Sequence, residues 1–189
     1  GNLDQDQTGI YSEWQQGVYD SFFYTAGVRY DDNSDFGNHF SYRLTSAYLI
    51  PVAQDELKLK ASYGTGFRPP SLFEIGENKA PWALPPASDT KLKEETSKGY
   101  DIGAEYHFCN GAYLEAVYFN QEIQDAIEYD LVNYSGYLQL NGDSTSEGVE
   151  VIGEMPLFAN LTTVAISSKT CASATTVSSI SFSVVWCDR

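Results

Sequence analysis

The stretch Ala61-Ser-Tyr-Gly-Thr-Gly-Phe-Arg-Pro-Pro-Ser-Leu-Phe-Glu-Ile75 decides how the rest of this sequence is interpreted. Its first half alternates small or polar residues with apolar ones, which continues a pattern that begins at Leu57. Pro69 and Pro70 follow, and proline cannot donate a hydrogen bond to a strand ladder. We therefore expect a strand that ends abruptly in a long loop, over residues 66–95. A structureless loop of roughly 30 residues is rare in compact soluble domains and usually carries a function.

Period-two alternation recurs on both sides of this stretch and predicts the face of each residue. It is clean over residues 22–30, 57–64 and 99–108, and weaker over residues 40–50, 112–121 and 148–153, where Arg43, Glu115 and Glu150 mark the polar side. The predicted apolar, lipid-facing set includes Tyr24, Ala26, Val28, Ile102, Ala104 and Tyr106. The predicted polar, lumenal set includes Arg29, Lys58, Lys60, Asp101 and Glu105.

The connections between these strands alternate in length. Short turns are expected at residues 17–20, 51–56 and 109–111, where Asn110-Gly111 is a strong hairpin signal, and a further turn at residues 155–160. Longer loops are expected at residues 31–38, 66–95 and 130–137. This alternation is typical of an up-and-down transmembrane β-barrel with short periplasmic turns and longer extracellular loops. The predicted fold is all-β and antiparallel, an incomplete open segment of such a barrel with about eight strands.

Composition excludes several classes of function. The chain has 189 residues and a net charge of -15, and its 11 Lys and Arg form no basic stripe, which argues against binding nucleic acid. It contains no run of 18 apolar residues and no signal peptide. The only methionine is Met155, so we expect a piece of a longer protein. Neither His39 nor His107 lies in a nucleophile motif, and the three cysteines fit no zinc spacing, so no enzyme is predicted.

A set of short motifs in a fixed order resembles one family. The segments are Thr8-Gly-Ile-Tyr11, Asp31-Asp-Asn-Ser-Asp-Phe-Gly37, Tyr63-Gly-Thr-Gly-Phe-Arg-Pro-Pro-Ser-Leu72, Leu92-Lys-Glu-Glu-Thr-Ser-Lys-Gly-Tyr-Asp-Ile-Gly103, Asp125-Ala-Ile-Glu-Tyr-Asp130 and Glu147-Gly-Val-Glu150. Over roughly residues 7–160 this order resembles the TonB-dependent outer-membrane receptors, and within that family most resembles the vitamin B12 (cobalamin) receptors.

The resemblance implies a function and a set of partners. Such receptors bind a scarce nutrient complex, cobalamin or a ferric siderophore, on extracellular loops. They import it through a barrel of roughly 22 strands that is occluded by an N-terminal plug. The chain would then lie in the outer membrane of a Gram-negative bacterium, in contact with lipid. The inner-membrane protein TonB would act through the plug, which this sequence lacks. Two alternatives stay open: a passive porin-like barrel, and a soluble β-sandwich that binds glycans on its aromatic residues.

Two candidate sites lie in the expected loops. Phe73, Trp82 and Leu84 supply apolar contact in the long loop, and buried Trp and Phe anchors dominate binding energy, so we expect them to contact the ligand. The alternative is a disordered Pro-rich loop. Asp31, Asp32 and Asp35 offer oxygen ligands that suit calcium, although the terminal bidentate glutamate of a calcium loop is missing. Apart from calcium, no cofactor is expected.

The tail from Leu161 to Arg189 departs from the preceding pattern. It is rich in Ser and Thr, contains neither Tyr nor Gly, and holds Cys171 and Cys187, two of the three cysteines. We therefore divide the chain into a partial barrel over residues 1–160 and an atypical tail over residues 161–189. The tail is interpreted as out of frame or otherwise non-native, and irregularly packed; the alternative is a genuine Ser/Thr-rich strand pair. The chain alone is expected to aggregate, or to form an open curved sheet.

Overall fold

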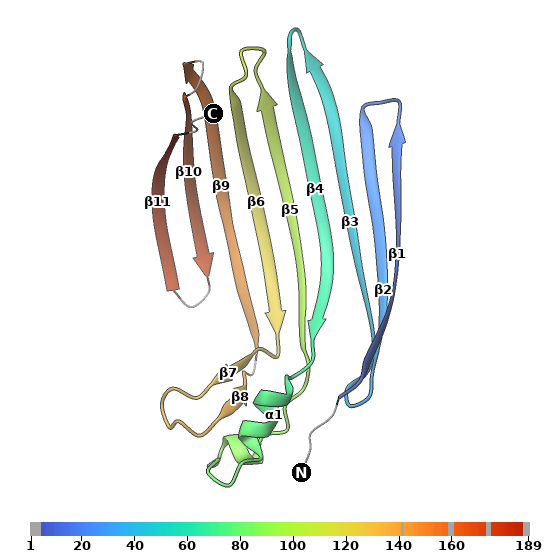
Figure 1. Cartoon of the computed structure of the whole chain (residues 1–189), viewed down its shortest axis with the longest axis vertical. Helices are drawn as coiled ribbons and strands as arrows, with labels where there is room; N and C mark the ends of the chain where they lie inside the picture. Colours follow the sequence, from blue (N-terminus) through green and yellow to red (C-terminus); the bar gives the residue numbers. More distant parts are fainter. Residues whose placement is uncertain (1–4, 141, 159–160, 173–174, 187–189) are drawn as a thin grey trace.

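The chain is a single long antiparallel sheet with a cluster of loops at one end (Figure 1). The computed structural model describes residues 5–140, 142–158, 161–172 and 175–186, with side chains described up to residue 156. In this part of the chain the sheet has nine strands. They are β1 (Gln7–Val18), β2 (Phe22–Asn33), β3 (Gly37–Val52), β4 (Asp55–Arg68), β5 (Glu95–His107), β6 (Tyr113–Gln124), β9 (Asp143–Phe158), β10 (Leu161–Ala172) and β11 (Thr175–Trp186).

Each strand pairs with the next one along the chain, in the order β1-β2-β3-β4-β5-β6-β9-β10-β11. A small hairpin of β7 (Ile127–Tyr129) and β8 (Tyr137–Gln139) is inserted between β6 and β9, which pair with each other. Among the described residues β1 and β11 each pair on one side only, so the sheet is open. The predicted antiparallel up-and-down topology and its incomplete closure are confirmed, with nine strands where about eight were expected.

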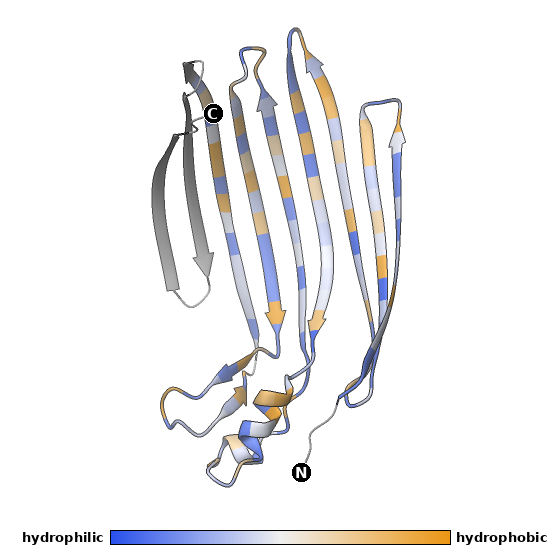
Figure 2. Cartoon of the chain, viewed as in Figure 1, coloured by the Kyte–Doolittle hydropathy of each residue, from blue (hydrophilic) through white to orange (hydrophobic). Residues whose placement is uncertain are grey.

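The two faces of the sheet follow the predicted register. Ile102 pairs with Ala61 and Tyr118, whereas its neighbour Asp101 lies on the opposite face and binds Ser62. Aromatic pairs such as Tyr42–Tyr63 and Tyr100–Tyr118 gather on the first face, which we call the apolar face. The second face, which carries Lys58, Lys60 and Glu105, is called the polar face. Figure 2 shows the alternation as bands of hydrophobic and hydrophilic residues along the strands.

The part of the sheet whose side chains the structure describes has no apolar core of its own. Apart from Pro70, the buried apolar side chains described are Ala87, Leu92 and Ile127, and all four residues lie outside the main sheet. On the apolar face Ile102 is 59% exposed, whereas Glu105 on the polar face is only 7% exposed. A soluble protein distributes these residue types the other way round, so the apolar face requires an apolar environment. None of the described helices is long and apolar enough to span a membrane.

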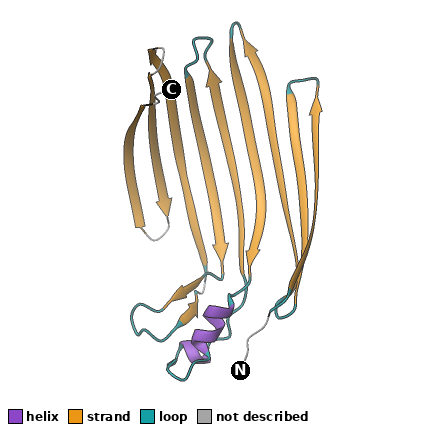
Figure 3. Cartoon of the chain, viewed as in Figure 1, coloured by secondary structure: helices purple, strands orange, loops and turns teal. Residues whose placement is uncertain are grey.

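Connections at the two ends of the sheet differ in size (Figure 3). One end has short turns, at residues 19–21, 53–54 and 108–112. The other end carries helix α1 (Leu72–Asn78), the 3-10 turn η1 (Ala87–Asp89) and the β7–β8 hairpin. We call residues 69–94 and 125–140 together the loop module. The long loop predicted at residues 66–95 is therefore present, but it is folded.

Two predicted connections are wrong. Residues 31–33 continue β2 instead of opening a long loop, because the charge of Asp31 is neutralised by Arg29. At the end of the strand, Asn33 Oδ1 accepts hydrogen bonds from the backbone N–H groups of Asp35 (3.0 Å) and Phe36 (3.2 Å). The polar run thus closes a tight turn at residues 34–36. The second wrong prediction is the turn at residues 155–160: its predicted start lies within β9, which extends to Phe158.

The backbone of the tail continues the sheet. Residues 161–172 pair with β9 and residues 175–186 pair with β10, both antiparallel. This arrangement is the strand-pair alternative, and it differs from the expected irregular packing. Whether these residues are the native continuation stays a prediction, and Cys171 belongs to the stretch whose side chains lie outside the described ones.

Candidate functional site

Arg68 anchors the loop module to the sheet. Its guanidinium donates to both carboxylate oxygens of Glu74 at 3.1–3.3 Å and, through Nε, to Glu95, the first residue of β5. Glu74 also accepts from the backbone N–H (2.7 Å) and hydroxyl (2.9 Å) of Ser71, the N-cap of α1, so the cap is a reciprocal capping box. Pro70 is fully buried beside it. The Arg-Pro-Pro-Ser motif therefore ends β4 and starts α1 in a fixed direction.

Two side-chain amides join the two loops of the module. Asn78 donates from Nδ2 to the Tyr137 carbonyl and accepts at Oδ1 from the Tyr137 N–H, both at 2.7 Å. Gln139 does the same for Lys93: its Oε1 accepts from the backbone N–H at 2.6 Å and its Nε2 donates to the carbonyl at 3.3 Å. Each amide thus acts as a short piece of strand, satisfying both backbone groups of one residue.

Gly136 makes the first of these pairs possible. Its φ is +134°, and a Cβ there would lie 2.6 Å from Asn78 Oδ1 and 2.9 Å from Ala87 Cβ. Only glycine tolerates both the backbone conformation and the close approach. The sequence analysis did not predict a role for Asn78, Gln139 or Gly136. The residues that they contact lie in the other loop, so no local sequence pattern indicates these contacts.

A tight turn at residues 130–136 is organised around one carboxylate. Asp130 Oδ1 accepts from the backbone N–H groups of Val132 and Asn133, both at 3.0 Å. Its Oδ2 accepts from the Asn133 side chain at 3.1 Å and the Ser135 hydroxyl at 2.7 Å. These hydrogen bonds stabilise the charged carboxylate and lower the pKa of Asp130 to about 2, and the bond from the Asn133 backbone N–H has the largest effect. The turn presents Leu131, Val132 and Tyr134 to solvent, each more than two-thirds exposed.

The predicted ligand contacts all lie on the surface of the loop module. Phe73, Trp82 and Leu84 are 64%, 69% and 58% exposed. Phe73 packs edge-on against Tyr137, with the ring centroids 6.2 Å apart, and the backbone N–H of Leu84 donates to Ser135 at 3.4 Å, so two of the three lie beside the second loop. Their role in binding stays a prediction.

A hollow of about 540 Å³ lies between α1, η1 and the β2–β3 turn. Its lining includes four apolar and four charged residues: Phe36, Leu72, Ile75, Leu92, Asp35, Lys79, Asp89 and Lys91. Phe73, Trp82 and Leu84 do not line it. The hollow therefore combines apolar surface with charged groups of both signs. The sequence offered no signal for this hollow, since it depends on how three segments fold together.

The carboxylates proposed for calcium do not form a cluster. Asp31 is 1% exposed and is paired with Arg29, with an Nε–Oδ2 distance of 2.6 Å and an Nη2–Oδ1 distance of 2.7 Å. Asp32, the next residue of β2, points to the opposite face of the sheet. No group of three His, Cys, Asp or Glu side chains suited to a metal is found in the described part of the chain. Calcium binding by Asp31, Asp32 and Asp35 stays a prediction, and the Arg29 pair weighs against it.

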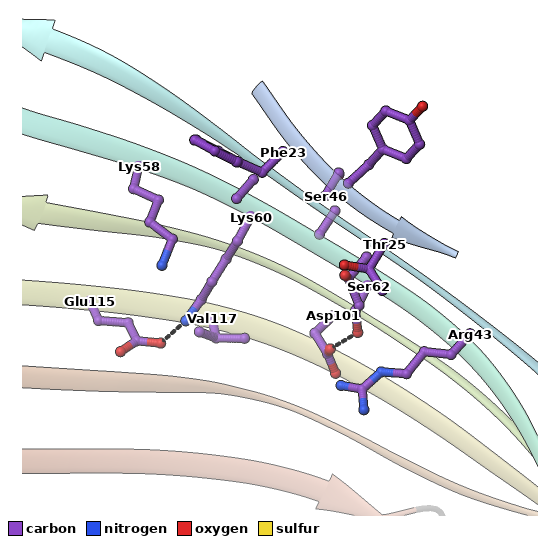
Figure 4. Close-up of a pocket in the computed structure, with 14 residues that line it drawn as sticks. Phe23, Thr25, Arg43, Ser46, Lys58, Lys60, Ser62, Asp101, Glu115 and Val117 are labelled. Atoms are coloured by element: carbon purple, nitrogen blue, oxygen red, sulfur yellow. Dashed lines mark hydrogen bonds and ion pairs between the residues drawn. The ribbon is translucent and has the colours of Figure 1, made fainter. Parts of the chain in front are cut away.

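On the polar face, four charged residues join three strands: Lys58 and Lys60 of β4, Glu105 of β5 and Glu115 of β6. Figure 4 draws Lys58, Lys60 and Glu115. Glu105 accepts from Lys58 Nζ at 3.1 Å and from Lys60 Nζ at 2.7 Å, and Lys60 also donates to Glu115. We call these four residues the Lys60 network. Lys60 reaches Glu115 by lying across β5 at Gly103, where a Cβ would be 3.1 Å from Lys60 Cε and 2.9 Å from Val117 Cγ2. Glycine at that position is therefore what allows one lysine to connect β4 with β6.

An open trough of about 490 Å³ follows the polar face beside this network. Arg43, Gly64, Gly66, Gly99, Asp101 and Gln121 are among its lining residues. A neighbouring hollow of about 540 Å³ shares Arg43, Ser62 and Asp101 with the trough, so the depression extends along several strands. The structure therefore offers two candidate contact surfaces, the loop module at one end and the polar face along the sheet.

Comparison with known proteins identifies the architecture. Residues 1–180 match the family model for the TonB dependent receptor-like β-barrel. The vitamin B12 transporter BtuB of Vibrio cholerae serotype O1 is 25% identical over 146 residues, 77% of this chain and 21% of that protein. BtuB of Photobacterium profundum is 33% identical over 106 residues, 52% of this chain and 14% of that protein. The chain spans about a fifth or less of the length of these curated relatives.

Solved structures agree on the fold. The siderophore receptor PirA from Pseudomonas aeruginosa superposes with a TM-score of 0.75 at 22% identity, covering 89% of this chain and 32% of PirA. The copper transporter OprC superposes with a TM-score of 0.67 at 20% identity, covering 89% of this chain and 28% of OprC. Together with the family match, these neighbours confirm the predicted incomplete transmembrane barrel.

Proposed function

Because the chain belongs to the TonB-dependent receptor family, as part of its β-barrel, we propose that it forms one wall and two outer loops of a nutrient receptor. That family consists of receptors and transporters, and we propose no enzymatic role. In this proposal the apolar face contacts the lipid of a Gram-negative outer membrane, and the polar face lines the lumen. The loop module then lies at the cell surface, where it meets a small nutrient complex. TonB would act through the plug of the whole receptor.

The observation that carries this proposal is the folded loop module. A flexible loop would lose conformational freedom on binding, whereas a loop already held by Arg68, Asn78 and Gln139 keeps that cost low. The module presents exposed aromatic and aliphatic side chains and borders the hollow described above. The inverted burial of Ile102 and Glu105 weighs against the soluble glycan-binding sandwich.

We propose cobalamin or a ferric siderophore as the substrate. Support comes from the names of the relatives, two of them vitamin B12 transporters and one a siderophore receptor. A passive porin-like barrel is less well supported, since the family match is to receptors and a wide pore does not need folded aromatic loops.

Binding to cells that express the whole receptor tests the proposal. Labelled cyanocobalamin, a ferric catecholate and a ferric hydroxamate are each titrated on wild type and on the Trp82→Ala and Leu84→Ala variants. Loss of an anchoring side chain should weaken binding of the correct ligand by roughly 10- to 100-fold. Tyr19→Ala is the matched control, because Tyr19 is an aromatic residue 95% exposed at the opposite end of the sheet. Unchanged affinity in both loop variants for every ligand would contradict the assignment.

A further inference from the structure

The ladder between β3 and β4 ends before either strand does. Its last pair toward the loop module is Arg43 with Gly64. Beyond that pair, residues 37–42 of β3 stay paired with β2 and residues 65–68 of β4 stay paired with β5, but these two segments do not pair with each other. Figure 1 shows β3 and β4 diverging toward the loop module. We call the space between the two segments the strand gap.

The strand gap begins where a band of tyrosines ends the apolar face. The rings of Tyr42 and Tyr63 have centroids 5.8 Å apart, and those of Tyr100 and Tyr118 have centroids 6.0 Å apart, so the band crosses β3, β4, β5 and β6. Amphipathic aromatic rings are enriched at the interface between lipid and water. Unpaired backbone groups are too costly in hydrocarbon, and β3 and β4 accordingly separate only beyond this band.

A pocket of about 260 Å³ lies at the strand gap. Thr65, Thr96 and Lys98 are among its lining residues, and the alternation along β4 and β5 places their side chains on the apolar face. Thr65 and Lys98 follow Tyr63 and Tyr100 by two residues toward the loop module, which is about 7 Å along a strand. The headgroup layer on each side of a bilayer is roughly 5–7 Å thick. The pocket therefore lies at the level of the lipid headgroups.

The ionisable groups around the pocket already have partners. Lys98 Nζ lies 2.9 Å from Glu122 Oε1, and His39 Nε2, on the other side of the strand gap, lies 2.6 Å from Glu94 Oε2. The His39 ring also stacks on Phe67, with the ring centroids 4.1 Å apart. A phosphate at this place would find no free cation and would lie near two carboxylates. The electrostatics therefore favour a ligand without charge.

The backbone along the strand gap requires both donors and acceptors. The Tyr42 N–H donates to Thr65 Oγ1 at 3.1 Å, so one side chain replaces one missing strand partner. In the described part of the chain, no other backbone group of residues 37–42 bonds across the gap. A phosphate offers acceptors, whereas each hydroxyl of a sugar offers a donor and an acceptor. Aromatic rings such as that of Phe67 supply apolar surface for the C–H groups of a sugar ring.

We propose that this pocket binds an uncharged sugar in the headgroup of an outer-leaflet glycolipid. The lipid source follows from continuity with the apolar face, because the acyl chains can lie against the tyrosine band while the headgroup reaches the strand gap. The volume corresponds to about nine waters at roughly 30 Å³ each, which suits one sugar ring. This site rests on the proposed function, which places the apolar face in a membrane.

Native mass spectrometry of the whole receptor tests the ligand class. Monoglucosyl diacylglycerol is titrated beside phosphatidylglycerol, diacylglycerol and free maltose. We expect one glycolipid to bind saturably and about tenfold more tightly than the other three, since only it combines hydroxyl groups with acyl chains. Equal binding of phosphatidylglycerol would indicate an anionic-lipid site, equal binding of diacylglycerol would indicate contact with acyl chains alone, and equal binding of maltose would indicate a site for soluble sugars. Each of these results, or no binding at all, would overturn the proposal.

Threonine variants test the location. Thr96→Trp fills the pocket and should weaken glycolipid binding about tenfold, and the smaller change Thr96→Val, which removes only the hydroxyl, should weaken it about threefold. Thr145→Trp is the matched control, because Thr145 lies on the apolar face of β9 as the partner of Glu122 and does not line the pocket. An equal loss in the two tryptophan variants, or no loss in either Thr96 variant, would show that the lipid binds elsewhere. Heat-dependent migration on a gel verifies folding.

Hydrogen exchange of residues 37–42 gives a second readout. Bound glycolipid should slow exchange of the amides that do not donate to β2, because sugar hydroxyls then accept from them in place of water. Exchange that stays the same at saturating glycolipid would mean that water alone occupies the strand gap, which contradicts the proposal.

Nutrient binding by the same receptor separates this site from the receptor function. If wild type binds cobalamin or a ferric siderophore but shows no preference for the glycolipid, the glycolipid site fails while the receptor function stands. If the glycolipid binds as expected but none of the nutrients does, the receptor function fails and the glycolipid site stands.

Discussion

The loop module and the sheet are built by opposite rules. The module buries Ala87, Leu92 and Ile127 and satisfies backbone groups with the amides of Asn78 and Gln139, as a small soluble domain does. The sheet exposes its apolar side chains on one face, and its other face holds charged groups that are partly buried against one another.

This difference indicates that the two regions of the chain are adapted to two environments, water and lipid. The module is suited to water and the apolar face to lipid, with Arg68 at the junction holding α1 to the ends of β4 and β5. Substitutions in the sheet should therefore change insertion and global unfolding, whereas substitutions in the module should change local opening. Each prediction below tests that separation, and all refer to the whole receptor folded in lipid.

The largest effect is expected for a charge on the apolar face. Ile102→Lys should destabilise the folded barrel by about 2–4 kcal/mol, the cost of placing a lysine side chain near the middle of the hydrocarbon layer. Gln121→Lys is the control, since Gln121 lies on β6 with its side chain on the polar face. Reversible denaturant unfolding in vesicles measures both. Equal costs would show that the apolar face does not meet lipid.

A smaller effect is expected in the Lys60 network. Lys60→Met leaves Glu115 without a cation and Glu105 with Lys58 alone, and we expect a loss of about 1–3 kcal/mol, less than for a fully buried pair because Lys60 is partly exposed. Adding Glu115→Gln should restore part of that loss, since it removes the carboxylate charge that was left unpaired. Lys98→Met, at an exposed pair with Glu122, should cause no measurable change. A loss at Lys98 equal to that at Lys60 would contradict the special role of the network.

The sheet could be predicted from the sequence because its information is local. Alternation along 57–64 and 99–108 fixes which residues share a face, and Asn110-Gly111 fixes a turn, without reference to any distant residue. The resemblance to the receptor family rested on the same segments and is confirmed. Where local reasoning failed, at residues 31–38, a polar run was interpreted as a loop although the Arg29–Asp31 pair keeps it in a strand.

The loop module could not be predicted in the same way. Its geometry depends on contacts such as Asn78 with Tyr137 and Gln139 with Lys93, separated by 59 and 46 residues. Nothing near Asn78 in the sequence distinguishes it from any other loop asparagine.

A local effect is expected when the module is opened. Asn78→Leu removes both hydrogen bonds to Tyr137 and leaves that residue's backbone groups unsatisfied, which should raise the free energy of the closed module by about 1–2 kcal/mol. Hydrogen exchange of residues 125–140 should accelerate by roughly 5- to 30-fold, while exchange in β4 and β5 stays unchanged. Gln124→Ala, which removes only a bond to Glu122, is the control. Acceleration throughout the sheet would contradict the separation of module and wall.

The smallest effect is expected from protonation of Asp130. In the folded module its pKa is lowered to about 2, below the value of roughly 3.9 for an unfolded chain. A lowered pKa means that the stabilisation is present above pH 4 and is lost as the pH falls from about 4 to about 2. Only the turn should respond, because the bonds to Asp130 come from Val132, Asn133 and Ser135.

Exchange of the Val132 and Asn133 amides, corrected for intrinsic rates, measures this response. It should accelerate between about pH 4 and pH 2 in wild type, since both amides donate to the carboxylate. Asp130→Asn separates charge from geometry: its carbonyl oxygen can still accept from the two amides, but it does not titrate. The variant should therefore show less protection than wild type at pH 6 and no further change down to pH 2. A pH dependence that persists in the variant would place the titrating group elsewhere, and a response that spreads into β5 would mean that the module and the wall unfold together.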